Sequence, residues 1–96
     1  MAKIKVEEHN GEKFVRYWCP GCKYEHAVEA VRWNWNGSFD APTLSPSVKH
    51  YYTITDSGDV VTTCHYHIRG GVIEFCNDCK HDLKGKKVPL QDVSEV

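Results

Sequence analysis

The sequence predicts a small β-rich domain, either all-β or α+β, in which antiparallel hairpins form a zinc-ribbon-like fold with a short helical turn near the C-terminus. Two glycine turns, Asn10-Gly11 and Gly70-Gly71, each separate runs of β-branched and aromatic residues, which is the pattern of a hairpin. Two Cys-x-x-Cys pairs, Cys19–Cys22 and Cys76–Cys79, have the spacing of metal ligands. A chain of 96 residues forms one domain over 1–96, and its small core would gain stability from a bound metal.

The first half of the chain contains one clear hairpin and one less regular strand. Residues Lys3 to Trp18 form two strands around the first glycine turn, and a two-residue loop places Val6 opposite Val15. From His26 to Trp35 apolar residues recur at alternate positions, which indicates another strand. The two-proline segment from Asp40 to Ser47 is expected to be a rigid loop.

The second half predicts a long hairpin followed by a short strand. Val48 to Thr55 and Val60 to Ile68 are the two arms of the hairpin, and Val72 to Phe75 follows the second glycine turn. If that turn is a two-residue loop, Cys64 faces the core while the histidine after it, His65, lies on the opposite face.

The C-terminal part carries the remaining elements. Lys80 to Gly85 suits a single helical turn closed by glycine, and Lys87 to Leu90 is expected to add an edge strand. We expect the acidic end, Gln91 to Val96, to fray.

The charge balance argues against nucleic acid as the main partner. The chain has 12 basic and 13 acidic side chains and a net charge of −1, so it lacks a strong positive field. Neither a signal-peptide apolar region nor a membrane-spanning stretch is evident, which predicts a cytoplasmic protein without a membrane partner. There the five cysteines would stay reduced, which favours metal thiolates over disulfides.

Metal ligands are predicted from the positions of the cysteines and histidines. Cys19 and Cys22 are the first two, because a Cys-Pro-Gly-Cys turn between strands is suited to wrap a metal, and Cys64 on a central strand is the third. The fourth position stays open between Cys79 and His81. The alternative is a four-cysteine ribbon that also uses Cys76, and zinc is the expected cofactor in each case.

Four motifs follow one another along the chain, namely CPGC, Pro42 to Ser47, Cys64-His65 and the segment Asp78 to Gly85. Their order resembles a family of small, uncharacterised phage and prophage proteins, some of which are named ammonia monooxygenases. The resemblance implies a zinc-binding phage protein in the host cytoplasm, without an established activity. The positions that match the family pattern are Cys19, Cys22, His26, Cys64, His65, Asp78 and His81.

Three functions are compatible with these features. We expect a structural zinc in a module that binds another protein, and therefore a binding role in preference to an enzymatic one. The first alternative is a zinc hydrolase in which His26, His65 and His81, with Asp78, hold an open metal. The second is a nucleic-acid-binding ribbon that uses the lysines near the C-terminus, namely Lys80, Lys84, Lys86 and Lys87.

A serine nucleophile is not expected from the sequence. Ser45 and Ser47 have no glycine-rich elbow beside them, and no base can be assigned to either residue from the sequence. Trp33 and Trp35 are expected to fill core volume, with each indole N–H bonded to a loop carbonyl.

Overall fold

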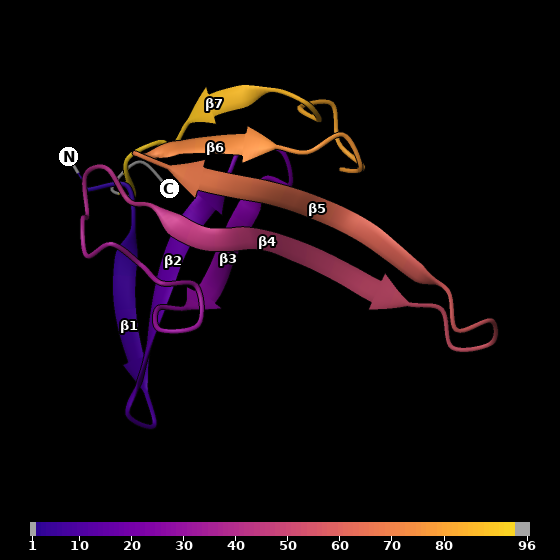
Figure 1. Ribbon diagram of the computed structural model, residues 1–96, viewed down its shortest axis with the longest axis horizontal. Coiled ribbons are helices and arrows are strands. Elements are labelled where there is room, and N and C mark those ends of the chain that lie inside the picture. Colours follow the sequence, from indigo (N-terminus) through magenta and orange to yellow (C-terminus); the bar gives the residue numbers. More distant parts are fainter. Residues whose placement is uncertain (1, 94–96) are drawn as a thin grey trace.

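The chain folds into two antiparallel sheets packed across one another, as the computed structural model in Figure 1 shows. The structure describes residues 2–93. The first sheet has the order β1-β2-β3 and the second the order β4-β5-β6-β7, which confirms the β-rich fold. The strands are β1 (Lys5–His9), β2 (Glu12–Cys19), β3 (Tyr24–Glu29), β4 (Leu44–Thr53), β5 (Val60–Arg69), β6 (Val72–Phe75) and β7 (Lys87–Pro89).

The first hairpin forms in the predicted register. Val6 lies opposite Val15, and the turn residues Asn10 and Gly11 have φ angles of 52° and 81°, as a type I′ turn requires. The next strand is shorter than predicted, because β3 ends at Glu29. Residues 30–34 form turns instead, and the Trp35 N–H donates to the Ala30 carbonyl.

The second sheet matches the prediction more closely. Ile68 lies opposite Ile73 across the Gly70-Gly71 turn, and burial alternates along β5, so that Cys64 is buried and His65 is on the other face. Strand β4 begins at Leu44, within the segment that we expected to be a loop, and its pairing with β5 shifts register between Leu44 and Val48.

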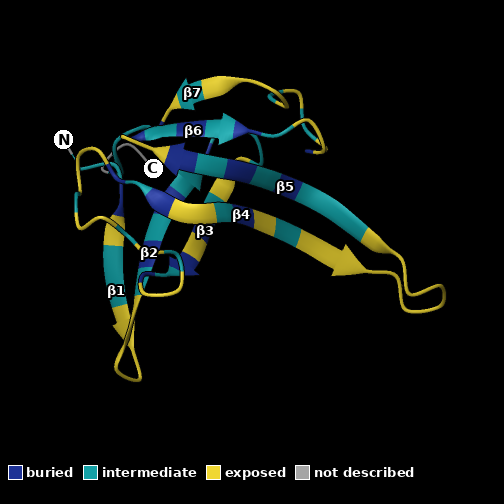
Figure 2. Ribbon diagram, viewed as in Figure 1, coloured by how far each residue is buried: buried dark blue, intermediate teal, exposed yellow. Residues whose placement is uncertain are grey.

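The core lies where the two sheets overlap. Burial is concentrated there, whereas the far part of the β4–β5 hairpin extends away from the body and is largely exposed (Figure 2). At the centre the rings of Tyr17 on β2 and Tyr66 on β5 meet edge to face, and their hydroxyl oxygens are 2.5 Å apart. This contact joins the two sheets in their most buried region.

Turns replace the predicted helix near the C-terminus. The Lys84 and Lys86 N–H groups donate to the carbonyls three residues earlier, and the described part of the chain has no α-helix. Strand β7 forms at the predicted edge. The end that we expected to fray is tied to the N-terminus as far as it is described, because Asp92 pairs with Lys3 at 2.8 Å and the Val93 N–H donates to the Ala2 carbonyl. Residues 94–96 lie outside the described part.

Candidate active site and metal cluster

A serine, a histidine and an aspartate form a hydrogen-bonded line on the outer face of the second sheet. Ser47 Oγ lies 3.1 Å from His65 Nε2. The other ring nitrogen, His65 Nδ1, lies 3.2 Å from each of the two carboxylate oxygens of Asp78. This is the arrangement of a nucleophile, a base and the group that orients the base.

The three side chains come from two neighbouring strands of the second sheet and from the loop after β6. Ser47 lies on β4 at the register shift, where its carbonyl accepts a hydrogen bond from Trp33 Nε1 at 3.3 Å. His65 lies on β5, and its carbonyl accepts the Cys76 N–H at 2.8 Å. This bond holds the start of the loop that carries Asp78 against β5 (Figure 1).

The geometry gives each member of the line a chemical role. When Nδ1 carries the ring proton and donates it to Asp78, Nε2 is left with a lone pair that can accept the Ser47 proton. The side chain of His65 is 26% exposed and that of Asp78 is 46% exposed, so the line is open to substrate and water.

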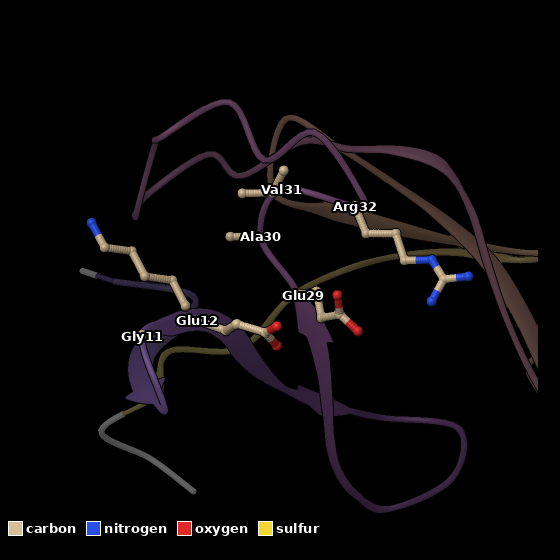
Figure 3. Close-up of a pocket in the computed structure, with 7 residues that line it drawn as sticks. Gly11, Glu12, Glu29, Ala30, Val31 and Arg32 are labelled. Carbon is tan, nitrogen blue, oxygen red and sulfur yellow. The ribbon is translucent and has the colours of Figure 1, made fainter.

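A shallow groove lies directly beside Ser47. It has a volume of about 480 Å³ and is lined by 43–47 together with His67 and Arg69. A larger hollow of about 710 Å³ lies between the β1–β2 turn and the end of β3. Figure 3 shows the Glu12 and Glu29 carboxylates beside it, and its lining contains no serine, cysteine or histidine. We therefore assign the chemistry to the groove beside Ser47.

A second cluster lies between the two sheets and contains three of the predicted metal ligands together with His26. Donor atoms of Cys19, Cys22, Cys64 and His26 all lie within 4.8 Å of one another. The sulfurs of Cys19 and Cys64 are 3.9 Å apart. Two sulfurs on a tetrahedral zinc, each about 2.3 Å from the metal, are separated by about 3.8 Å. The cysteines therefore fit this ion, although the metal itself is not identified by their positions.

His26 and His81 approach this cluster in different ways. His26 is 4% exposed, and its Nε2 atom is buried without a hydrogen-bond partner. His81 Nε2 lies 3.4 Å from Cys64 Sγ, while its Nδ1 accepts the Leu83 N–H at 3.3 Å. A neutral ring that accepts at Nδ1 carries its proton on Nε2, so His81 donates a hydrogen bond to the Cys64 sulfur.

The thiols perturb one another strongly. A hydrogen bond from Cys64, opposed by burial, lowers the pKa of Cys19 to about 4. The hydrogen bond to Cys19, together with burial, raises the pKa of Cys64, while burial and the negative Cys19 raise the pKa of Cys22 to about 11. Without a cation this trio holds one thiolate readily. A bound metal would stabilise the three thiolates together.

The last predicted ligand, Cys79, forms hydrogen bonds with the backbone of His65. Cys79 is buried, its sulfur accepts the His65 N–H at 3.2 Å, and its thiol donates to the His65 carbonyl at 3.1 Å. Cys79, Cys64 and His81 also have donor atoms within 4.8 Å of one another. The structure thus places the other four predicted ligands around Cys64, and their role in binding a metal stays a prediction.

The three histidines of the predicted zinc hydrolase do not meet. His26 belongs to the buried thiol cluster, His81 contacts Cys64, and His65 faces Ser47 on the outer side of the sheet. The alternation of β5 separates His65 from Cys64 and accounts for this division. The sequence prediction that combined the three histidines in one open site is therefore wrong.

The contact between Ser47 and His65 was not predicted from the sequence. The dismissal of Ser47 as a nucleophile depended on the lack of an assignable base, and the structure supplies His65 at hydrogen-bond distance. Pairing of β4 with β5 would have suggested the contact, but the register shift before Val48 is not visible in the sequence. The tryptophan prediction is confirmed in part. Trp33 and Trp35 are partly buried against the core, and Trp35 Nε1 donates to the loop carbonyl of Ser38, whereas Trp33 Nε1 donates to the Ser47 carbonyl on β4.

Comparisons with known proteins add a family. Residues 2–76 match the family described as bacterial ubiquitination-like system serine protease (BubE). The matched range includes Ser47 and His65 and ends two residues before Asp78. Searches of curated proteins and of solved structures gave no match. No helix in the described residues is long and apolar enough to cross a membrane. Because the match covers well over half of the sequence, the chain belongs to the BubE family of bacterial ubiquitination-like system serine proteases.

Proposed function

We propose that this protein is a serine peptidase whose nucleophile is Ser47. The observation that carries the proposal is the line of contacts from Ser47 Oγ to His65 Nε2 and from His65 Nδ1 to Asp78. The name of the matched family supports the same reaction class. This proposal replaces the non-enzymatic role that the sequence alone favoured.

The residues would act in the order that their contacts suggest. Ser47 Oγ attacks the scissile carbonyl carbon while His65 Nε2 takes the hydroxyl proton, and Asp78 stabilises the resulting imidazolium through Nδ1–H. His65 then gives the proton to the leaving amine as the C–N bond breaks, leaving an acyl ester on Ser47. A water molecule, deprotonated by the same histidine, hydrolyses this ester and releases the acid.

The thiol cluster would hold a structural zinc in this scheme. Cys19, Cys22 and Cys64 supply three sulfurs, and His26 supplies the buried nitrogen that otherwise has no partner. A closed site of this kind contributes folding energy and does no chemistry. It would also brace the catalytic line, because Cys64 directly precedes His65 and joins β5 to the first sheet.

The substrate would be a protein of a ubiquitination-like system, in keeping with the printed description of the family. The phage origin and cytoplasmic location predicted from the sequence are part of this proposal.

A protein-binding role is the second candidate, and the projecting hairpin favours it. Tyr51, Tyr52, Ile54 and Val60 are large hydrophobic residues that are 42–61% exposed on this arm. Ser47 and the two tyrosines share β4, so a folded substrate that contacts the arm would lie close to the nucleophile. Replacing both tyrosines with serine should weaken protein binding and leave hydrolysis of a small ester unchanged.

Hydrolysis by matched variants tests the peptidase proposal. We expect wild-type protein to cleave an activated acyl ester, such as a p-nitrophenyl ester, and Ser47→Ala to lose this activity at unchanged thermal stability. Ser57→Ala is the control, because Ser57 lies at the exposed tip of the hairpin. Equal rates for Ser47→Ala and wild type would refute the proposal.

A further inference from the structure

The loop that carries Asp78 also places Cys76 close to His65, so that three potential metal ligands lie together. Donor atoms of His65, Cys76 and Asp78 lie within 4.8 Å of one another, and Cys76 is partly exposed. Cys76 is outside the buried thiol cluster, so its sulfur is not needed there. An imidazole, a thiol and a carboxylate together are a donor set that zinc accepts.

We propose that His65, Cys76 and Asp78 form an inhibitory zinc site, a proposal that rests on the peptidase assignment for its functional consequence. The nitrogen that faces Asp78 is Nδ1, at 3.2 Å from both carboxylate oxygens. Ligand atoms on a tetrahedral zinc are separated by about 3.3–3.8 Å, given metal–ligand bonds of about 2.0–2.3 Å. Small side-chain adjustments would therefore admit the ion between them.

The backbone fixes this site in advance. The Cys76 N–H donates to the His65 carbonyl at 2.8 Å, and the Cys79 N–H donates to the Cys76 carbonyl at 3.4 Å. Cys79 is bonded in turn to the backbone of His65 through its sulfur. The two ends of the loop are thus held against β5, and three protein ligands leave a fourth position for water.

Zinc at this position would disable the base without covering Ser47. A metal bound at Nδ1 leaves the neutral ring with its proton on Nε2, so that this nitrogen becomes a donor and can no longer accept the Ser47 proton. The metal would also take the place of the Asp78 hydrogen bond that orients the ring. Free zinc should therefore suppress the peptidase reversibly.

Zinc stoichiometry and covalent labelling test the proposal separately. Protein freed of loosely bound metal is titrated with zinc chloride, bound zinc is measured by equilibrium dialysis, and Ser47 is labelled with a fluorophosphonate. Wild type should bind one zinc more than Cys76→Ala, which removes the sulfur, and the affinity for this zinc should fall at least about 10-fold in the variant. His67→Asn, which changes a neighbouring histidine outside the ligand set, should keep the additional zinc.

The labelling rate reports the functional consequence. Zinc at a concentration that just fills the wild-type site should slow labelling of wild type at least about 10-fold, because loss of a general base lowers a rate by about 10²–10⁴. At the same concentration the weakened site of Cys76→Ala stays largely empty, so its labelling should be unaffected. Equal zinc binding, or equal inhibition, in wild type and Cys76→Ala would overturn the site. Absence of labelling before zinc is added would refute the peptidase assignment instead, and the dialysis result would then decide on the metal site alone.

Discussion

Replacing Asp78 by asparagine tests the Ser47–His65–Asp78 triad, because the change removes the charge of the side chain and keeps its shape. Asp78 faces His65 Nδ1 at 3.2 Å and is 46% exposed. A hydrogen bond to a charged group contributes about 1.5–3 kcal/mol, and exposure to water favours the lower end of that range. Because about 1.4 kcal/mol corresponds to a tenfold change in rate, we expect kcat/KM to fall roughly 10- to 30-fold.

The assay is hydrolysis of an activated ester by Asp78→Asn beside Asp56→Asn, which makes the same chemical change in the exposed turn of the hairpin. A buried triad aspartate gives a larger loss on the same change, of about 10⁴ in kcat, because the asparagine that replaces it holds the histidine in the wrong tautomer. Thermal unfolding of both variants shows whether a loss of activity reflects a loss of fold. An Asp78→Asn variant as active as wild type would refute the role assigned to this carboxylate.

Further predictions concern the metal and the core. Chelation of the zinc should unfold the protein, as monitored by circular dichroism. A structural zinc contributes a binding free energy on the order of 10 kcal/mol. This is comparable to the free energy of unfolding of a domain of this length, roughly 5–14 kcal/mol. His26→Asn should lose bound zinc in elemental analysis, whereas His81→Asn should retain it with weakened affinity; the opposite result would assign His81 as the ligand. Tyr66→Phe should destabilise by about 1–3 kcal/mol in urea unfolding and more than Tyr17→Phe, since it removes the partner of both the Tyr17 hydroxyl and His50 Nε2. Equal losses in the two tyrosine variants would contradict this account of the core.

The hairpins were predictable because short turns fix their own register. Asn10-Gly11 and Gly70-Gly71 set the pairing of Val6 with Val15 and of Ile68 with Ile73, and alternation along β5 then separated Cys64 from His65. Each of these inferences depends on residues that are close in the sequence.

The candidate active site depends on contacts that local patterns do not encode. Ser47 meets His65 only because β4 starts early and shifts its register, and Asp78 meets the histidine through a turn that is held by Cys76 and Cys79. The sequence contained all three residues, and the family pattern drew attention to His65 and Asp78. The family pattern did not reveal that Ser47, 18 residues before His65, forms a hydrogen bond with this histidine.

Mapping a covalent serine probe tests the central claim most directly. The protein is treated with a fluorophosphonate and digested, and the modified residue is identified by mass spectrometry. The account predicts a single adduct on Ser47 that is absent from Ser47→Ala and forms far more slowly in His65→Gln. Absence of an adduct, an adduct on another serine, or labelling of Ser47 at the same rate without His65 would contradict it.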